Sequence, residues 1–284
     1  MTTASSSSSS AAAAAAQSSG EARKRPEYII EHMEEDDPDA PAVFPQWALL
    51  EYGHMLTLLG PGTTCHFTSL SNASLHSLQL QLDRVAQPRA DFELHTASFT
   101  NALEVPLTSI CLLDPQAPLG LSVSDAGLYS AAQQIEASGS SSSSSSSSSP
   151  TSPELPGGPF SHFLFGGILG DDPPRDRTSS LRKLGMPRRH LSGMQMTTDT
   201  ALGVTCQVVE RGKGMALDKT EQMGPNGALQ WCHAPELNFG NGESVSMPFR
   251  YMVDPKSPSG NPRPLMPPGM RELIRSDMDR AFEF

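Results

Sequence analysis

The chain has 284 residues, 37% of them hydrophobic, and a formal net charge of −11. This acidic balance argues against general binding to nucleic acids, since contacts to phosphates need clustered lysine and arginine side chains. No apolar run approaches the roughly 18 residues of a membrane-spanning helix, so we expect no membrane segment.

Two low-complexity segments divide the chain. Residues 1–26 are rich in serine and alanine, and residues 131–158 contain unbroken serines at 140–149. Such tracts bury too little apolar surface to offset the loss of chain entropy on folding. We therefore expect a disordered tail at 1–26 and one folded domain over 27–284. Because structured patterns resume on both sides, residues 131–158 should form a disordered insertion that loops out of this domain.

The ordered part alternates between strand and helix patterns. In chain order, these patterns predict a strand at 28–30, a helix at 47–58, a strand at 67–70, a helix at 75–85, strands at 92–96, 108–113 and 160–165, a helix at 175–184, a strand at 189–191, and helices at 197–211 and 269–284. The alternation predicts an α/β fold with a mostly parallel sheet and helices on both faces. Ligands bind such sheets at the carboxyl ends of the strands, so the loops after Leu113, Phe165 and Leu191 are candidate sites.

The loop at residues 165–178, with the sequence FGGILGDDPPRDRT, is the densest candidate. Three glycines directly after a predicted buried strand permit a tight turn and close approach of the backbone to a ligand. The alternative is a tight turn with a solvated cluster of charges. The loop is neither a Walker A motif nor G-x-G-x-x-G, and the first predicted strand ends without a glycine. These absences count against a nicotinamide or flavin enzyme.

Two further segments follow predicted strands. Residues 191–200 bring hydroxyl groups and a carboxylate to a helix start, where they can cap the helix or hold an adenosine. The Asp114-Pro115 turn after the strand at 108–113 is a weaker signal. A basic strip can be a solvated helix face or a contact to an RNA-bearing partner; its residues are Arg175, Arg177, Arg182, Lys183, Arg188 and Arg189.

The four cysteines stand singly and favour neither a disulfide framework nor a metal site. Cys65 precedes His66 and Cys232 precedes His233, but adjacent residues rarely bind one ion together. We therefore predict no metal site. The N-terminus lacks the charged start of a secretory signal, so we also expect a reducing, intracellular compartment.

Several blocks, read together, resemble a known family. They are YIIEHMEE at 28–35, WALLEY at 47–52, FGGILGDDPPRDRT at 165–178, QMTTDTA at 195–201, MPFRY at 247–251 and PGM at 268–270. In this order they are similar to the fungal protein arginine methyltransferases of the SPOUT superfamily. The resemblance covers about 27–274. The long tail, the serine insertion and an expanded segment at 212–230 depart from the family pattern.

The resemblance implies a trefoil knot in the C-terminal part of the sheet and S-adenosylmethionine bound by the three strand-end loops. Carried over by position, the cofactor-binding residues are Leu112, Leu113, Asp114, Pro115, Gly166, Gly167, Ile168, Leu169, Gly170, His190, Leu191, Gln195, Met196, Thr197 and Thr198. It also implies a cytoplasmic enzyme, monomeric rather than dimeric, that methylates an arginine of a small-subunit ribosomal protein without added metal. Contact with ribosomal RNA is the functional interpretation of the basic strip, not of the resemblance.

Methyl transfer from a sulfonium is an in-line displacement that depends mainly on positioning. A guanidinium stays protonated at neutral pH, and a paired carboxylate can orient its planar fork. The candidate catalytic carboxylates are Asp171, Asp172, Asp176 and Glu34. An RNA methyltransferase on the same fold is the alternative, followed by a non-catalytic ribosome-associated protein.

Overall fold

The computed structural model describes residues 24–129, 157–166, 176, 178–216 and 224–281. Its centre is a six-stranded sheet in the order β3-β2-β1-β5-β4-β6, in which every pairing is parallel. The strands are β1 (Glu27–Glu31), β2 (Thr64–Thr68), β3 (Asp91–Leu94), β4 (Ile110–Leu113), β5 (His162–Gly166) and β6 (Arg188–Arg189). The predicted α/β class with a mostly parallel sheet is therefore confirmed.

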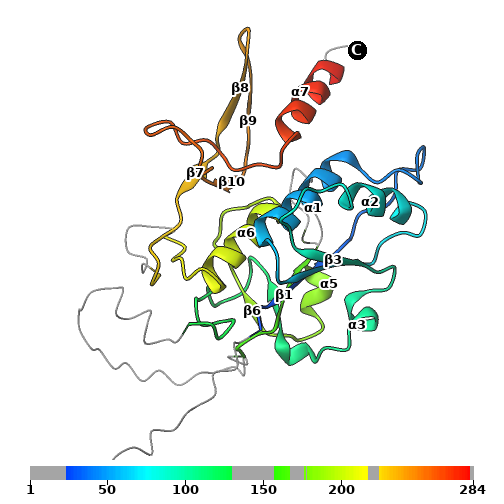
Figure 1. Cartoon of the computed structure of the whole chain (residues 1–284), viewed down its shortest axis with the longest axis vertical. Helices are drawn as coiled ribbons and strands as arrows, with labels where there is room; N and C mark the ends of the chain where they lie inside the picture. Colours follow the sequence, from blue (N-terminus) through cyan, green and yellow to red (C-terminus); the bar gives the residue numbers. More distant parts are fainter. Residues whose placement is uncertain (1–23, 130–156, 167–175, 177, 217–223, 282–284) are drawn as a thin grey trace, which may run out of the picture.

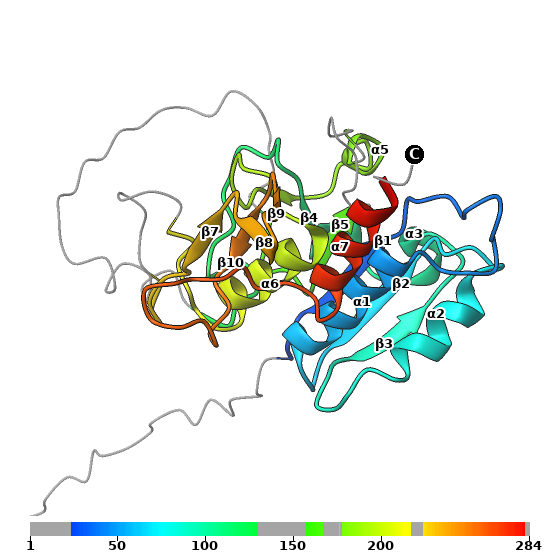
Figure 2. The same cartoon turned by 90° about the horizontal axis from the view of Figure 1, so that it is seen from above.

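Helices cover both faces of this sheet (Figures 1 and 2). One face carries α1 (Gln46–Leu59), α2 (Leu75–Leu82) and α6 (Thr198–Val209). The other carries α3 (Phe99–Ala102) and α5 (Ser179–Arg182), and a short 3-10 helix at Leu107–Ser109 leads into β4. Within the described residues, none of the helices is both long and apolar enough to cross a bilayer.

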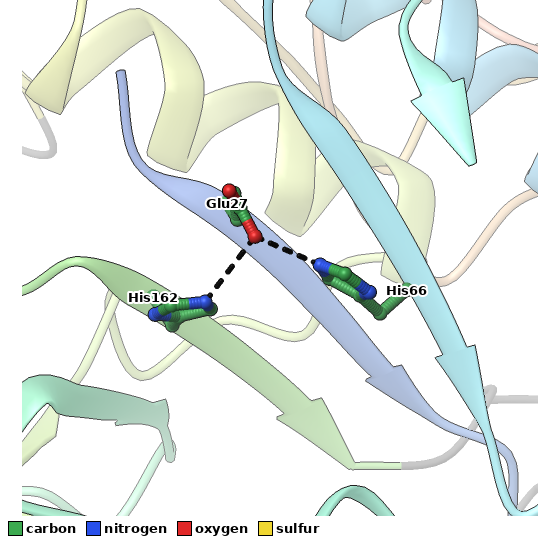
Figure 3. A group of neighbouring side chains, drawn as sticks. All are labelled: Glu27, His66 and His162. Atoms are coloured by element: carbon green, nitrogen blue, oxygen red, sulfur yellow. Dashed lines mark hydrogen bonds and ion pairs between the residues drawn. The ribbon is translucent and has the colours of Figure 1, made fainter. Parts of the chain in front are cut away.

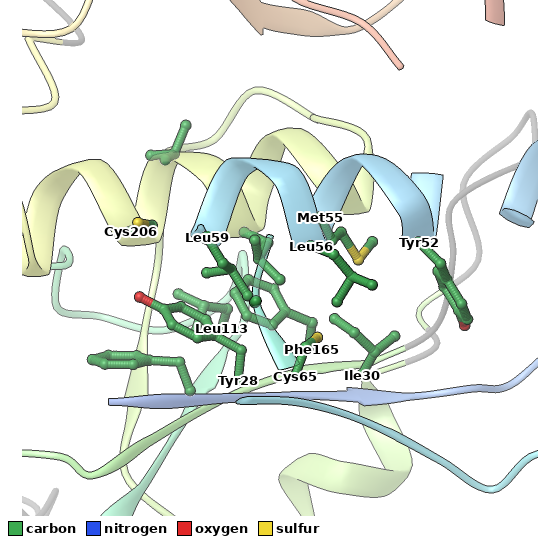
Figure 4. Packing of buried hydrophobic residues seen from close by; sticks show 14 of the residues in the cluster. Tyr28, Ile30, Tyr52, Met55, Leu56, Leu59, Cys65, Leu113, Phe165 and Cys206 are labelled. Carbon is green, nitrogen blue, oxygen red and sulfur yellow. The ribbon is translucent and has the colours of Figure 1, made fainter. Parts of the chain in front are cut away.

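The two faces have separate apolar cores because side chains alternate along a strand. Tyr28 and Ile30 of β1 face α1 and α6 and join the larger core (Figure 4). Ile29, between them, joins a smaller core with Phe99 of α3 and Leu181 of α5. All four cysteines are buried and free.

A further layer packs on α1 and α6, away from the main sheet (Figure 1). In it, β7 (Trp231–His233) pairs antiparallel with β10 (Arg250–Met252), and β8 (Glu236–Gly240) pairs antiparallel with β9 (Glu243–Ser246). Helix α7 (Met270–Ala281) follows. This last helix was predicted from the sequence, but the four strands were not, because they are short and lack an apolar run.

Most other predicted elements appear with shifted ends. Only Ser179–Arg182 of the predicted helix at 175–184 is helical among the described residues. Arg25, assigned to the disordered tail, instead belongs to the fold, since its guanidinium donates to Glu210 and to the Leu59 carbonyl. The predicted knot depends on the path of residues 167–175, which lie outside the described residues, so the knot stays a prediction.

Candidate functional site

A cavity of about 350 Å³ opens at the carboxyl ends of β4, β5 and β6, beside the start of α6. Its walls are mostly apolar with a few polar groups, as is typical of small-molecule sites. The lining residues are Leu113, Asp114, Pro115, Gln116, Phe165, Gly166, Asp176, Thr178, Leu191, Ser192, Gly193, Met194, Gln195, Met196, Thr198 and Ala201. Three loops that are far apart in the sequence therefore meet at one edge of the sheet.

Asp114 fixes the first loop. Its buried carboxylate accepts hydrogen bonds from Arg188 Nη1 at 2.7 Å and Arg182 Nη1 at 3.2 Å. The same carboxylate accepts the backbone N–H of Gln116 at 3.0 Å, which closes the turn through Pro115. Because two guanidinium groups neutralise it, Asp114 holds the loop in place and is not available to bind a substrate cation.

The second loop begins at Gly166, the last residue of β5. A Cβ atom there would lie 2.6 Å from Leu181 Cδ1 and 3.1 Å from Thr178 Cγ2, so glycine lets α5 approach the strand end. Asp176 is exposed at the cavity wall. The pKa of this carboxyl is lowered, mainly because Arg182 donates hydrogen bonds to it. Partial burial acts in the opposite direction, and a further hydrogen bond from Thr178 also lowers the pKa.

The third loop, between β6 and α6, is held by Arg250 of β10. The backbone N–H of Arg250 donates to the Gln195 carbonyl at 3.0 Å. Its buried guanidinium donates to Ser192 Oγ and to the Leu191 carbonyl, and it stacks 4.2 Å from the centre of the Trp231 ring. The antiparallel pair β7–β10 thus positions the loop that forms one wall of the cavity.

A buried polar cluster lies directly behind this wall, where α6 begins. His54 Nδ1 of α1 lies 2.7 Å from Asp199 Oδ2, one residue after the cavity residue Thr198. Burial, and next the negative charge of Asp199, raise the pKa of Glu51 well above its ordinary value. Burial also raises the pKa of Tyr251, whose hydroxyl is buried and has no hydrogen-bond partner in the part of the chain that the structure describes. This cluster fixes α1 against α6 and was not predicted from the sequence.

The structure brings most of the described candidate cofactor residues to the cavity. Those in its lining are Leu113, Asp114, Pro115, Gly166, Leu191, Gln195, Met196 and Thr198, together with the candidate carboxylate Asp176. Gly167, Ile168, Leu169, Gly170, Asp171 and Asp172 lie outside the described residues.

The described part of the cavity wall does not include Leu112, His190, Thr197 or Glu34. Leu112 faces the smaller core, since side chains alternate along β4. The His190 ring packs beside Gly120, and Thr197 precedes α6 and donates its hydroxyl hydrogen to Thr200 Oγ1 at 2.8 Å. Glu34 follows β1 at the same sheet edge, because Glu31 pairs with Gly166.

Some lining residues were missed. Phe165 and Thr178 are the two ends of the predicted loop at 165–178 but were not selected as site residues. Gln116 and Ala201 follow the selected residues Pro115 and Thr198 by one and three positions, and the helical period would have indicated Ala201. Ser192, Gly193 and Met194 lie within the predicted loop but were not selected individually.

The parallel sheet and the cavity at its carboxyl edge define an α/β protein with a small-molecule site. The chain matches the family model described as protein arginine N-methyltransferase SFM1-like over residues 27–132 and 146–281. It therefore belongs to the family of SFM1-like protein arginine N-methyltransferases.

The similar proteins agree with this assignment. The chain is 29% identical over 265 residues to protein arginine N-methyltransferase SFM1 of Saccharomyces cerevisiae, covering 90% of this chain and 97% of that protein. It is similar to the crystal structure of yeast SFM1 complexed with SAM, with a TM-score of 0.60 and 27% identity. The match covers 89% of this chain and 91% of the yeast chain. For the crystal structure of yeast SFM1 complexed with SAH, the TM-score is 0.59 with 28% identity, and the match covers 87% of this chain and 94% of the yeast chain.

Proposed function

We propose that this protein transfers a methyl group from S-adenosylmethionine to an arginine side chain of another protein. The observation that carries the proposal is the single cavity built by three strand-end loops in a member of the SFM1-like family. The yeast SFM1 structures that resemble this chain over about nine-tenths of its length are complexes with SAM and SAH.

The described lining suits an adenosine-containing cofactor. Leu113, Phe165 and Met196 supply apolar surface for a flat base. Among the described residues, the amide nitrogen Nε2 of Gln195 is buried without a hydrogen-bond partner, so it can donate to a bound ligand. Both carboxylates in the described lining, Asp114 and Asp176, are already paired with arginines.

In the transfer, a guanidinium nitrogen of the substrate attacks the methyl carbon as the bond from carbon to sulfur breaks. The nitrogen then loses a proton to water, leaving methylarginine and the thioether product. Holding donor and acceptor in line supplies most of the acceleration. Asp176 is the described carboxylate best placed to orient the acceptor, because Arg182 can keep its bond to Asp114 if Asp176 turns to a substrate guanidinium. Asp171 and Asp172 remain candidates for the same role.

We also propose a cytoplasmic monomer whose acceptor is a small-subunit ribosomal protein. The net charge of −11 suits an arginine-rich segment. The described arginines of the basic strip favour a protein acceptor over RNA, because each one already pairs with an acid. These pairs are Arg182 with Asp114 and Asp176, Arg188 with Asp114, and Arg189 with Asp125.

The test is methyl transfer from radiolabelled cofactor to separated protein and RNA fractions of small ribosomal subunits. We expect label on one protein in acid-stable form and none on RNA; label on RNA alone would establish the RNA alternative. The variant Ala201→Phe fills the cavity and should abolish cofactor binding in calorimetry, while Ala73→Phe, exposed before α2, should bind normally. Wild-type protein that fails to bind the cofactor would support the non-catalytic alternative.

A further inference from the structure

A cluster of histidine and glutamate side chains lies at the opposite end of the sheet from the cavity. Glu27 begins β1, His162 begins β5, and His66 is the third residue of β2 (Figure 3). Glu27 and His162 are direct partners across the two strands, and His66 pairs with Ile29. Three neighbouring strands therefore point these side chains to the same place, on the sheet face that carries Ile29.

The three ligand atoms have the spacing of a tetrahedral metal site. Glu27 Oε2 lies 2.9 Å from His66 Nε2 and 3.4 Å from His162 Nε2. All three atoms lie within 4.8 Å of one another. Metal–ligand bonds of about 2.0–2.2 Å to histidine and carboxylate place tetrahedral ligand atoms roughly 3.3–3.6 Å apart. Lengthening the contact between Glu27 and His66 by a few tenths of an ångström would bring both contacts of Glu27 into this range.

The other atoms of the cluster support binding through these three. Lys24 Nζ pairs with Glu27 Oε1 at 2.5 Å, so Glu27 Oε2 is the oxygen directed at the two rings. The second nitrogen of His66, Nδ1, lies 3.3 Å from Glu93 Oε2 on β3, close enough to donate its hydrogen with a small adjustment. A carboxylate at the far nitrogen is the usual means of fixing a metal-binding histidine in the required tautomer.

Burial separates this arrangement from an ordinary surface ion pair. The side chains of His66, His162 and Glu27 are 6%, 12% and 17% exposed, so they are largely withdrawn from water but still reachable at the sheet edge. A cation bound by two neutral rings and one carboxylate compensates the charge of Glu27.

We propose that Glu27, His66 and His162 form a binding site for one transition-metal ion of the Zn²⁺ class, with water as the fourth ligand. Two imidazoles and one carboxylate suit Zn²⁺ and its neighbours rather than Mg²⁺ or Ca²⁺, which prefer all-oxygen sets. The site lies at the amino ends of the strands, away from the cavity, so it ties β2, β1 and β5 together and takes no part in methyl transfer. The site could not be recognised from the sequence, because His66, Glu27 and His162 lie far apart in the chain and only Cys65 stands next to His66.

The test uses the full chain stripped of metal with a chelator and titrated with Co²⁺, then with Zn²⁺. We expect one equivalent of Co²⁺ with the intense visible bands of a four-coordinate site, displacement of those bands by Zn²⁺, and a higher melting temperature with Zn²⁺ bound. Absence of saturable Co²⁺ binding by the folded wild-type chain would overturn the proposal.

Variants locate the ion. His162→Gln and the nearly isosteric Glu27→Gln should each weaken binding by more than tenfold, while the exposed control His76→Gln should bind as the wild type does. His95→Gln should also keep one equivalent, because His95 lies near Glu93 and outside the proposed ligand set. Loss of binding in His95→Gln with normal binding in His162→Gln and Glu27→Gln would place the ion elsewhere and refute the site. Cofactor binding by each variant, unchanged from the wild type, reports that the fold is intact.

Discussion

Replacing Arg250 with lysine tests whether the layer outside the α/β domain positions the cofactor loop. The guanidinium holds Ser192 Oγ and the Leu191 carbonyl while it stacks on Trp231. Lysine keeps the charge but cannot donate both hydrogen bonds and stack on the Trp231 ring at the same time. A hydrogen bond to a charged group contributes about 1.5–3 kcal/mol, and a cation–π contact about 0.5–2 kcal/mol.

Part of this lost free energy will lower the stability of the free protein. The rest will weaken cofactor binding, because the loop must then become ordered when the cofactor binds. We expect the affinity for S-adenosylmethionine to fall about tenfold, which corresponds to about 1.4 kcal/mol. Calorimetric titration measures the affinity, and thermal melting of the free protein measures the loss of stability. Arg271→Lys is the matched control, because Arg271 also stacks on an aromatic ring, Phe239, and donates to a carbonyl, but in α7 away from the cavity. Unchanged affinity in a folded Arg250→Lys protein would refute this role.

Three other substitutions test the core, the strand end and the buried acids. Leu56→Ala removes a fully buried side chain of α1 and should lower the free energy of unfolding by about 2–5 kcal/mol in urea titrations. Gly166→Val should displace Leu181 and α5 and cost at least tenfold in cofactor affinity; normal calorimetric affinity would contradict the close approach. The raised pKa of Glu51 means that the folded state holds its proton at pH values above 4.5, where the unfolded state releases it, so this group makes stability fall as pH rises from 4.5. Glu51→Gln should remove this fall, so the urea midpoint of the variant should rise relative to that of the wild type as pH increases toward neutral. Parallel curves of urea midpoint against pH for the two proteins would contradict this role of Glu51.

The sequence predicted the sheet and the edge that binds the ligand because these depend on local patterns. Strand and helix periodicity placed Leu113, Phe165 and Leu191 at loops of the same edge, and the structure brings all three to one cavity. The separation of Leu112 from Leu113 was also predictable, since adjacent residues in a strand face opposite sides. Only the family resemblance suggested a particular cofactor.

Long-range pairing could not be predicted in this way. Two acidic partners of the basic strip, Asp114 and Asp125, lie far from it in the sequence, so their pairing with Arg188 and Arg189 could not be predicted. The strands β8 and β9 were predictable in principle. Asn241 and Gly242 have φ angles of 54° and 83° at the turn between them, and Asn-Gly is a strong hairpin signal.

The order of the strands has a consequence for synthesis on the ribosome. Strands β1, β2 and β3 with their helices are contiguous in the chain and can pair as soon as they emerge, because their contacts are local. The other edge of β1 stays unpaired until β5 has been synthesised, and β5 follows the long serine segment in the chain. Until then the nascent chain exposes an unpaired central strand, the kind of edge that other chains can join. Slow translation of the serine codons would lengthen that interval, and chaperone demand should be greatest there.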